Sequence, residues 1–502
     1  MQAGRRIVWT NEKEINRENI AEVLRDAWAV FTANRSDCSE LIDFEKGIQP
    51  LTREKTYRSD IDIVCIDNVA NEIVTFKTGY QWSNDMLFVQ RGVKDSGDAE
   101  EHNAIALFNE CFTSENVKAK TQELAYYVET TGIGYTFVDV NTDYEDGDSF
   151  FKYEVLDPMH TFIVRSLAYI DRRPVMGVTF REDTQGNQYF TCFTPTHRYE
   201  LAGISGVYIH GDRSGDINPL GMIPIVEWIR AYDRMGCFER QIDDMNTLNI
   251  EESDFANLID QNVQAIWHAN DVEFAKNEDG SVKTPKSNDW VFTQTTRDGK
   301  TPFITPLAVP SEYTGIMTNI SSKRAAILQK CNIPARNDNS GGSTGVAMSD
   351  ATGWTQADVE AQKQQSIMEG CKMQEAKLAL RAIKLCAATP SDSPLLRLRH
   401  SDIKPNIKRQ KNYEMVTKAN TFATLISHGV YGLHVINAIN FFDDPQQVWE
   451  DSKENIEKYQ KSLFEKQTST VQEKAGADES DQIENSPNID GMNREDPDGE
   501  DE

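Results

Sequence analysis

PSEYTGIMTNISSKRAAILQKCNIP, residues 310–334, decides how the rest of the chain is interpreted. Its apolar residues recur mostly at steps of three and four, which is the spacing of one face of a helix. Ser311 can cap the start of this helix, and Pro334 follows its expected end. The next stretch, NDNSGGSTG (337–345), suits neither a helix nor a strand, and a second long helix is predicted from about 355 to 386. The pattern predicts a flexible polar loop held between two long helices.

Length and composition limit the classes of protein to which the chain can belong. At 502 residues it is too long for one ordinary core, so several modules are expected. No run approaches the roughly 18–20 apolar residues that span a bilayer, and residues 1–6 carry two arginines without the apolar region of a signal peptide behind them. The eight cysteines are scattered without a C-x-x-C motif, which indicates buried free thiols in a reducing cytoplasm.

The charge of the chain is strongly negative, with a formal net value of −28. This argues against a protein that grips nucleic acid tightly, because neutralising phosphates requires Lys and Arg. Part of the charge lies at the C-terminus, where residues 473–502 hold twelve acidic residues against Lys474 and Arg494, a local net charge of −10. This composition predicts a disordered acidic tail over residues 466–502.

The N-terminal half changes from a helical to a strand-like pattern near Gly132. Helices are expected over residues 11–35, 67–80 (ending at Gly79), 100–109 and 114–130. The expected strands are 132–140, 151–156, 161–165, 175–181, 188–194, 198–201, 206–210 and 222–228. Six or so of these strands would form a modest sheet beside the N-terminal helices.

The longest uninterrupted helical pattern covers Phe238–Trp267, a rod of about 45 Å. Between it and the helix at residue 311 lie several prolines, turn signals and two strand-like stretches, 272–275 and 289–295. The plain topology is a helix, a small β module and a second helix that returns antiparallel. Such a hairpin with its own β tip projects from a body, although an ordinary amphipathic core helix is an open alternative for residues 238–267.

No catalytic motif is present in the sequence. There is no Walker-type G-x-x-x-x-G-K-[ST], and the Gly-rich loop 341–345 has no lysine after it. G-x-S-x-G and H-E-x-x-H are absent, and His428 and His434 are six residues apart, the wrong step for two ligands on one helical face. The carboxylate pairs considered as metal sites are Asp62 with Asp67 and Asp243 with Asp244. Such pairs are usually solvated surface, so no catalytic residue, cofactor or metal is expected.

Four segments, taken in order, carry a resemblance to a known family. They are DNVANEIV (67–74) with KTGY (77–80), NPLGMIPIVE (218–227), SGGSTGVAM (340–348) and FFDDP (441–445). Together, over residues 60–465, they resemble the portal proteins of tailed double-stranded-DNA phages, in the branch found in long-tailed phages. A low content of Lys and Arg fits this resemblance, because a channel wall that binds phosphates weakly lets DNA slide.

The resemblance implies an α+β, predominantly helical subunit that forms a ring, usually of twelve copies, around a DNA channel. The implied segments are a wing body with an α/β core over 1–237, a first stem helix over 238–269, a small β clip over 270–310, a second stem helix over 311–333, a tunnel loop over 334–354, a long wing helix and link over 355–405, and a helical crown over 406–465. The acidic tail 466–502 matches no motif of the family.

The resemblance also implies partners and site residues. The partners are further copies of the chain, double-stranded DNA in the channel, the terminase large subunit, the head–tail adaptor, and the major capsid and scaffolding proteins, with no membrane. The implied residues are Asn337, Asn339, Ser343, Thr344, Val346 and Met348 in the tunnel loop, Ile259, Ile320, Lys323 and Arg324 between subunits in the stem, and Lys283, Lys286, Trp290 and Arg297 for docking at the clip. Lys323 and Arg324 either face the channel or pair with an acidic helix of the neighbouring subunit, and the second is favoured. The implied location is the portal vertex of the virion, after assembly in the host cytoplasm.

Two other functions remain open on the sequence. A helical adaptor whose hairpin binds a protein partner would be a monomer or dimer rather than a closed ring. A metal-dependent nuclease built on acidic clusters would hydrolyse DNA in the presence of divalent cations and lose this activity when one carboxylate pair is changed.

Overall fold

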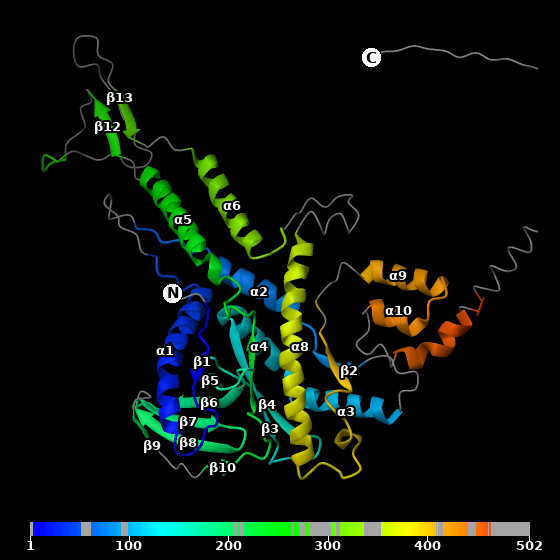
Figure 1. Cartoon of the computed structure of the whole chain (residues 1–502). Coiled ribbons are helices and arrows are strands. Elements are labelled where there is room, and N and C mark those ends of the chain that lie inside the picture. Colours follow the sequence, from blue (N-terminus) through cyan, green and yellow to red (C-terminus); the bar gives the residue numbers. More distant parts are fainter. Residues whose placement is uncertain are drawn as a thin grey trace, which may run out of the picture. The chain divides into compact units, whose positions relative to one another are not determined.

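The computed structural model describes residues 4–51, 62–91, 99–204, 208–210, 215–263, 266–270, 277–281, 303–307, 312–335, 353–407, 409, 415–439, 448–459 and 461–462. The chain divides into two compact units, Met1–Lys411 and Asn412–Glu502. Figure 1 shows the body and the helical hairpin of the first unit and the short helices of the second. No helix among the described residues combines the length and the apolar character needed to cross a bilayer.

A seven-stranded sheet forms one part of the body. Its strands are β1 (Val8–Thr10), β5 (Thr161–Ser166), β6 (Pro174–Glu182), β7 (Asn187–Phe193), β8 (His197–Ile204), β9 (Tyr208–His210) and β10 (Asp216–Ile217). The order is β1-β5-β6-β7-β8-β10, with β9 also paired to β8, and β1 runs parallel to β5. Alternate side chains of the sheet bury against α1 (Ile20–Glu45), where Trp28 packs on Phe190 and Phe31 stacks on Phe162. This period-two burial is what the alternating sequence predicts.

A second sheet, of order β11-β3-β4, lies beside three helices. Its strands are β3 (Ile133–Val140), β4 (Phe151–Leu156) and β11 (Ile225–Ile229), and the helices are α3 (Ala99–Ser114), α4 (Val117–Thr131) and α8 (Trp354–Leu385). The fully buried Glu375 of α8 accepts hydrogen bonds from Thr136 (2.6 Å), Tyr153 (3.1 Å) and Trp228 (2.9 Å). It also forms an ion pair with Lys372 at 2.9 Å. A buried carboxylate with this many donors fixes α8 on the sheet in one position.

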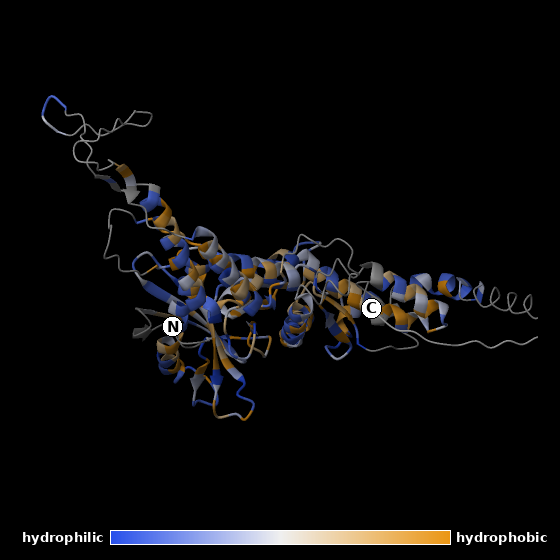
Figure 2. Ribbon diagram, turned by 90° about the horizontal axis from the view of Figure 1, so that it is seen from above, coloured by the Kyte–Doolittle hydropathy of each residue, from blue (hydrophilic) through white to orange (hydrophobic). Residues whose placement is uncertain are grey.

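The helical hairpin consists of α5 (Ile242–Val263), β12 (Ile266–Asn270), β13 (Phe303–Leu307) and α6 (Tyr313–Lys330). β12 and β13 pair antiparallel, from Ile266 opposite Leu307 to Asn270 opposite Phe303. Figure 1 shows that the hairpin extends away from the body, and Figure 2 shows hydrophobic and hydrophilic segments mixed along it. The described residues thus show a helix, a pair of strands and a returning helix, with strands at 266–270 and 303–307 that were not predicted. The predicted strands 272–275 and 289–295 lie outside the described residues.

The first hairpin helix is shorter than the predicted 238–267. Phe238 lies in the core of the body, Glu239–Gln241 form one 3-10 turn, and Trp267 belongs to β12. The physical reason is that the backbone of residues 266–270 takes its hydrogen bonds from a partner strand that is distant in the sequence, which helical periodicity alone cannot reveal.

Other boundaries also differ from the prediction. The first helix is 20–45 rather than 11–35, and α2 (Val69–Gln81) continues past Gly79, because a glycine inside a helix costs only about 1 kcal/mol. The short strands β1, β2 (Leu87–Gln90) and β10 were not predicted, because two to four residues are too few for periodicity. The expected extended link 390–405 contains a 3-10 turn, Pro394–Leu396, and most of β14 (Ile403–Asn406), which pairs with β2.

The second unit is a small helical cluster. It contains α9 (Met415–Ser427), α10 (Gly432–Ile439) and a further helix over 448–459. Ile426 and Val435 share one apolar cluster, and Leu433, Ile436 and Trp449 share another. A helix was predicted from residue 406, but Asn406 ends β14, so the helix begins later. The predicted acidic tail 466–502 lies outside the described residues.

The tight approach of the β11–α5 connection to α4 yields a stability prediction. A Cβ atom on Gly236 would overlap the backbone carbonyl oxygen of Thr130, whereas a Cβ on the exposed helical Gly370 would meet nothing within 4 Å. We therefore expect Gly236→Ala to lower the free energy of unfolding by more than about 2 kcal/mol, and Gly370→Ala to raise it by up to about 1 kcal/mol. Urea unfolding of both variants checks this, and changes of the same sign would contradict the packing described.

Candidate functional site: the base of the hairpin and the loop 334–354

Helix α6 ends in a left-handed cap that turns the chain toward α8. Asn332 has a φ of 55°, and its backbone N–H donates to the carbonyl of Gln329 at 3.0 Å. The N–H of Ile333 reaches back to the carbonyl of Leu328 at 2.9 Å. This pair of bonds is the Schellman arrangement, in which asparagine substitutes for the more usual glycine. Pro334 then prevents the helix from continuing.

The two ends of the loop 334–354 lie close together. α8 begins at Trp354, directly after Gly353, which has a φ of 86°. A Cβ atom on Gly353 would lie 3.8 Å from the Cα atom of Pro334. The chain therefore leaves the body and returns to it at one place. The predicted loop residues Asn337, Asn339, Ser343, Thr344, Val346 and Met348 lie outside the described residues, between these two ends.

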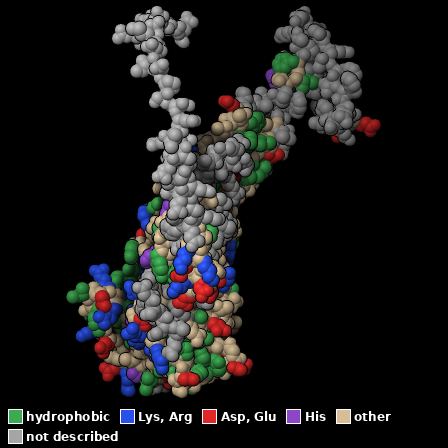
Figure 3. All heavy atoms as spheres, turned by 90° about the vertical axis from the view of Figure 1, so that its right-hand side faces the viewer, with side chains coloured by type: hydrophobic (Ala, Val, Ile, Leu, Met, Phe, Trp, Pro, Cys, Tyr) green, Lys and Arg blue, Asp and Glu red, His purple; other side chains and the backbone are tan. Residues whose placement is uncertain are grey.

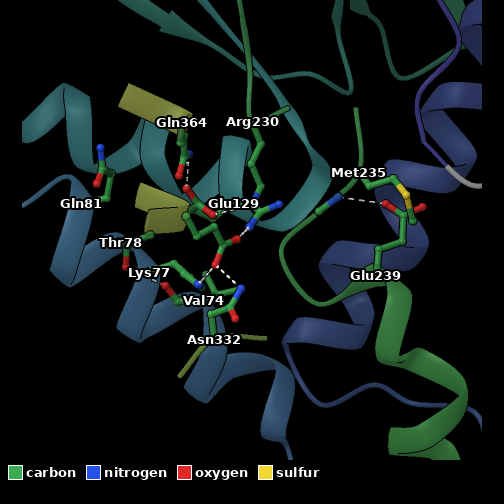
Figure 4. A network of polar contacts seen from close by, with 12 residues as sticks. Val74, Lys77, Thr78, Gln81, Glu129, Arg230, Met235, Glu239, Asn332 and Gln364 are labelled. Atoms are coloured by element: carbon green, nitrogen blue, oxygen red, sulfur yellow. Dashed lines mark hydrogen bonds and ion pairs between the residues drawn. The ribbon is translucent and has the colours of Figure 1, made fainter. Parts of the chain in front are cut away.

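A partly buried carboxylate, Glu360 on the first turns of α8, joins the elements at this place. Figure 4 shows Lys77, Arg230 and Asn332, which point toward one another from different elements. Glu360 forms ion pairs with Lys77 of α2 and with Arg230, which follows β11. It also accepts a hydrogen bond from the side chain of Asn332 at 3.0 Å. Burial alone would raise the pKa of Glu360, but Lys77 and then Arg230 outweigh it, so the pKa is lowered. Glu360 thus connects the cap of α6, the start of α8 and the body.

Arg230 extends this network into the core. Its Nε donates to Glu129 of α4 at 3.0 Å, and Glu129 also accepts from Trp82 (3.0 Å) and Gln364 (2.5 Å). Burial alone would lower the pKa of Arg230, but the carboxylate of Glu129 is the largest opposing effect, and the pKa is raised. The guanidinium therefore remains charged and holds two carboxylates on different helices, which is the geometry that its planar fork favours.

The connection from β11 to α5 is held by further buried ion pairs. Glu227 accepts from Arg234 at 2.7 Å and from Arg165 at 2.8 Å. Glu239 accepts from the side chain of Arg5 at 2.5 Å. Burial would raise the pKa of Glu227, but Arg234 and then Arg165 lower it to about 2. The base of the hairpin is therefore fixed by charged contacts on both sides, at α5 and at α8.

Inside the hairpin, the basic residues of α6 pair with carboxylates of their own chain. Lys323 binds Glu251 of α5, and Lys330 binds Asp244 at 2.5 Å. Arg324 binds Asp67 at 2.7 Å and Glu72 of α2. Lys323 and Arg324 were predicted to face the channel or a neighbouring subunit, and these partners within the chain were not predicted.

The two apolar stem residues differ in exposure. Ile320 is partly buried and packs on the cluster that contains Leu248 and Ile327, whereas Ile259 is 42% exposed. Ile259 is therefore available for a contact with another molecule, and Ile320 mainly stabilises the chain itself. The predicted clip residues Lys283, Lys286, Trp290 and Arg297 lie outside the described residues.

A polar stripe on α5 holds an extended segment, residues 62–67, which we name the strap. Asn257 binds the backbone N–H (2.8 Å) and carbonyl (3.0 Å) of Ile63, and the hydroxyl of Ser253 binds those of Cys65 (2.9 and 3.1 Å). Asn249 accepts from the backbone N–H of Asp67 at 3.0 Å. The stripe therefore replaces the partner strand that an extended segment normally needs.

Possible metal ligands and thiols can be located among the described residues. Among them no three His, Cys, Asp or Glu side chains gather as metal ligands would. All eight cysteines are free, and burial raises the pKa of Cys38 and of Cys331 to about 11. On the face drawn in Figure 3, Lys and Arg side chains are interspersed with Asp and Glu rather than gathered into a separate basic patch.

The comparison with known proteins decides the family. The family described as phage portal protein, SPP1 Gp6-like, matches residues 33–462, which is most of the chain. The chain belongs to this family of phage portal proteins. The predicted α+β portal fold and the predicted family are thereby confirmed.

Two solved structures of gene transfer agent (GTA) particles are similar to this portal protein. One is the neck of an empty particle, with 12% identity over 76% of this chain and 92% of the other, at a TM-score of 0.39. The second is the virion of the native particle, with 12% identity over 79% and 90% of the two chains, also at a TM-score of 0.39. No curated protein matches the chain.

Several functional residues of the portal subunit were missed by sequence reasoning. Asn332 carried a usable signal, since an asparagine two residues before a proline at a helix end favours a left-handed cap. The stripe of Asn249, Ser253 and Asn257 recurs every four residues, but no local pattern indicates the segment that it binds, since Cys65 and Ser253 are 188 residues apart. Glu360 and Glu129 carried no signal, because their partners are distant in the sequence.

Glu360 should contribute strongly to the stability of the portal subunit. Glu360→Gln leaves Lys77 and Arg230 with one charge fewer to bind, so we expect the free energy of unfolding to fall by about 3 kcal/mol. The matched control is Glu369→Gln on the same helix. Among the described residues its carboxylate binds only Gln365, so the free energy of unfolding should change by no more than about 0.5 kcal/mol. Urea unfolding measures both, and equal losses would contradict the role of Glu360.

The buried Glu227 should make stability depend on pH. Its folded pKa of about 2 lies below the ordinary 4.5, so its contribution is complete above about pH 4.5 and is lost as the pH falls toward 2. At pH 7 we expect the free energy of unfolding of the wild type to exceed that of Glu227→Gln by up to about 3 kcal/mol. This difference in free energy should shrink as the pH falls from 4.5 to 2.5. Urea unfolding at several pH values measures the difference, and a constant difference would be the contrary result.

Proposed function

We propose that this portal protein forms a ring-shaped channel at one capsid vertex, through which double-stranded DNA is packaged and ejected. The observation that supports this most is the α5–α6 hairpin, which is fixed at its base by buried ion pairs and has exposed apolar side chains along its length. In the proposed ring, usually of twelve copies, the hairpins are the stem that surrounds the channel. The role is structural, with assembly in the host cytoplasm and a final place in the virion.

The exposed apolar side chains of the hairpin favour contacts between subunits. Ile259 on α5 and Met317 on α6 are 42% and 57% exposed, although both belong to the predicted apolar stripes. Covering such side chains stabilises by roughly 25 cal/mol per Å² of apolar area removed from water. A ring supplies this cover on both sides of every hairpin, because each subunit has two neighbours.

The loop 334–354 is the segment that we assign to the channel. Its ends are held together by Glu360 and Asn332, so any length of chain between them extends from one fixed place. The loop sequence has few charges, and Asp338 and Asp350 discourage tight binding of phosphates. Loops of this kind would follow the DNA through weak polar contacts and allow it to slide.

The remaining segments receive the roles that the family suggests. The β tip over 270–310 would dock the terminase large subunit and later the head–tail adaptor, with Lys283, Lys286, Trp290 and Arg297 as candidate contacts. The helical unit that begins near residue 412 would be the crown, facing the capsid interior, and the body 1–237 would be the wing, which meets capsid and scaffolding proteins. The described pairing of β12 with β13 supports a separate β module at the tip.

Cysteines in the loop test the proposal. Ser343→Cys or Thr344→Cys should form disulfides between neighbouring subunits in the assembled ring, and oxidised particles should package DNA at least tenfold less well than reduced ones. The native thiols with raised pKa values react slowly, so the new bonds can be identified on a non-reducing gel.

The matched control is Ile170→Cys, an exposed position on the body. It should neither cross-link nor change packaging. Rings in which the loop cysteines fail to cross-link, or in which cross-linking leaves packaging unchanged, would refute the assignment of the loop to the channel.

A further inference from the structure

The strap has two backbone edges, and α5 satisfies only one of them. The polar side chains of α5 bind the backbone of Ile63, Cys65 and Asp67, which are alternate residues. The spacing of the polar side chains along α5 matches the spacing of alternate residues in the strap. Four residues of a helix rise about 6 Å, and two residues of an extended segment span about 6.6 Å. In an extended segment, the groups of the intervening residues point the opposite way.

In the described part of the chain, the outer edge of the strap is open at Val64 and Ile66. Among the described residues, the backbone N–H and carbonyl groups of Val64 and Ile66 have no hydrogen-bond partner. Their side chains are 53% and 36% exposed, and that of Ile63 is 40% exposed. An exposed apolar segment with an unpaired backbone edge pairs readily with another surface, and proteins normally cover such edges.

Most of the strap lies on the side of α5 opposite α6, and only its last residue, Asp67, reaches α6, through the ion pair with Arg324 at 2.7 Å. The α5 residues that hold the strap are Asn249, Ser253 and Asn257, and those that meet α6 are Asp244, Glu251 and Phe255. At about 100° per residue, the two sets are centred roughly 180° apart around the helix. Figure 1 agrees, with α6 on one side of α5 and the blue segment that leads to α2 on the other. Each hairpin therefore presents the strap on one flank and α6 on the opposite flank.

The face of α6 that points away from α5 carries no charged side chain. The basic residues of α6, Lys323, Arg324 and Lys330, all bind carboxylates of α5, of α2 or of the strap. The opposite face is exposed and consists of small or uncharged residues: Thr314, Gly315, Thr318, Ser321, Ser322, Ala325, Ala326 and Gln329. Covering this face desolvates no charge, which removes the largest cost of forming an interface.

The same face repeats the pattern that already binds the strap. Thr314, Thr318 and Ser322 recur every four residues, as Asn249, Ser253 and Asn257 do on α5. Hydroxyl groups both donate and accept, and Ser253 binds both backbone groups of Cys65 in this way. Three hydroxyls at that spacing therefore match the backbone groups on the outer edge of the strap.

We propose that, in the assembled ring, the open edge of the strap docks on the uncharged face of α6 of the neighbouring subunit. The contact is heterologous, since the strap of each subunit meets α6 of the next, and a contact of this kind generates a closed ring. Val64 and Ile66 place their backbone groups and apolar side chains against the hydroxyl ladder and the alanines of α6. The inference rests on the proposed ring, and the following experiment separates the two.

The test is a disulfide between subunits. Val64→Cys combined with Thr318→Cys, in a Cys65→Ser background, should produce a ladder of covalent oligomers on a non-reducing gel. A disulfide within one chain is excluded, because a helix of about 10 Å diameter separates the two positions and a disulfide needs Cα atoms within about 7 Å. The control pair, Val64→Cys with Ile170→Cys, should remain monomeric on the gel.

A second variant tests the backbone edge itself. Val64→Pro removes only the outward N–H, so it should weaken ring assembly at least tenfold while the melting temperature of the dissociated chain stays within about 2 °C. Cys65→Pro removes the N–H that binds Ser253 and should lower that melting temperature instead. Mass photometry and thermal melts read out the two effects. Rings that form without the predicted cross-link overturn the strap contact alone, whereas a wild-type protein that forms no ring overturns both the contact and the proposed function.

Discussion

The ion pairs of Arg230 with the buried carboxylate of Glu129 and the partly buried carboxylate of Glu360 are the constraint on which the rest of the structure depends. Arg230 lies between β11 and α5, Glu129 on α4, and Glu360 at the start of α8, so one guanidinium fixes the sheet, the body helices and the hairpin base together. Because Asn332 also binds Glu360, the ends of the loop 334–354 are held by the same network. Removing Arg230 would leave the fully buried Glu129 without its cation, which costs several kcal/mol.

The hairpin follows a different principle from the body. The body is held by apolar packing of two sheets against helices, whereas along the hairpin polar groups make many of the contacts, through the α5 stripe, the strap and the pairs Glu251–Lys323 and Asp244–Lys330. These contacts use the charges of α6 within the chain and leave its outer face neutral. The apolar and hydroxyl groups of the hairpin therefore stay exposed in the single subunit. Such groups can form contacts between subunits, which is expected of a protein whose stable form is an assembly.

Much of the fold could be predicted from the sequence, and the reasons for the misses are physical. Strands such as 151–156 and the helix from 354 to 385 show strong periodicity, and the prediction found them almost to the residue. The end of α5 was missed because Trp267 pairs with Pro306, a contact between distant residues that no local pattern contains. The ion-pair network was missed for the same reason, since Lys77, Arg230 and Glu360 are far apart in the sequence. The predicted loop and clip residues remain predictions.

The arrangement of the hairpins in the assembled particle tests this account most directly. A cryo-electron microscopy map of the purified assembly should show a closed ring in which the α5–α6 hairpins stand side by side around one axis, with residues 334–354 on the axial side. In such a map the density of the strap should lie between its own α5 and the next α6. A monomer or dimer, or a ring whose loops point away from the axis, would contradict the account.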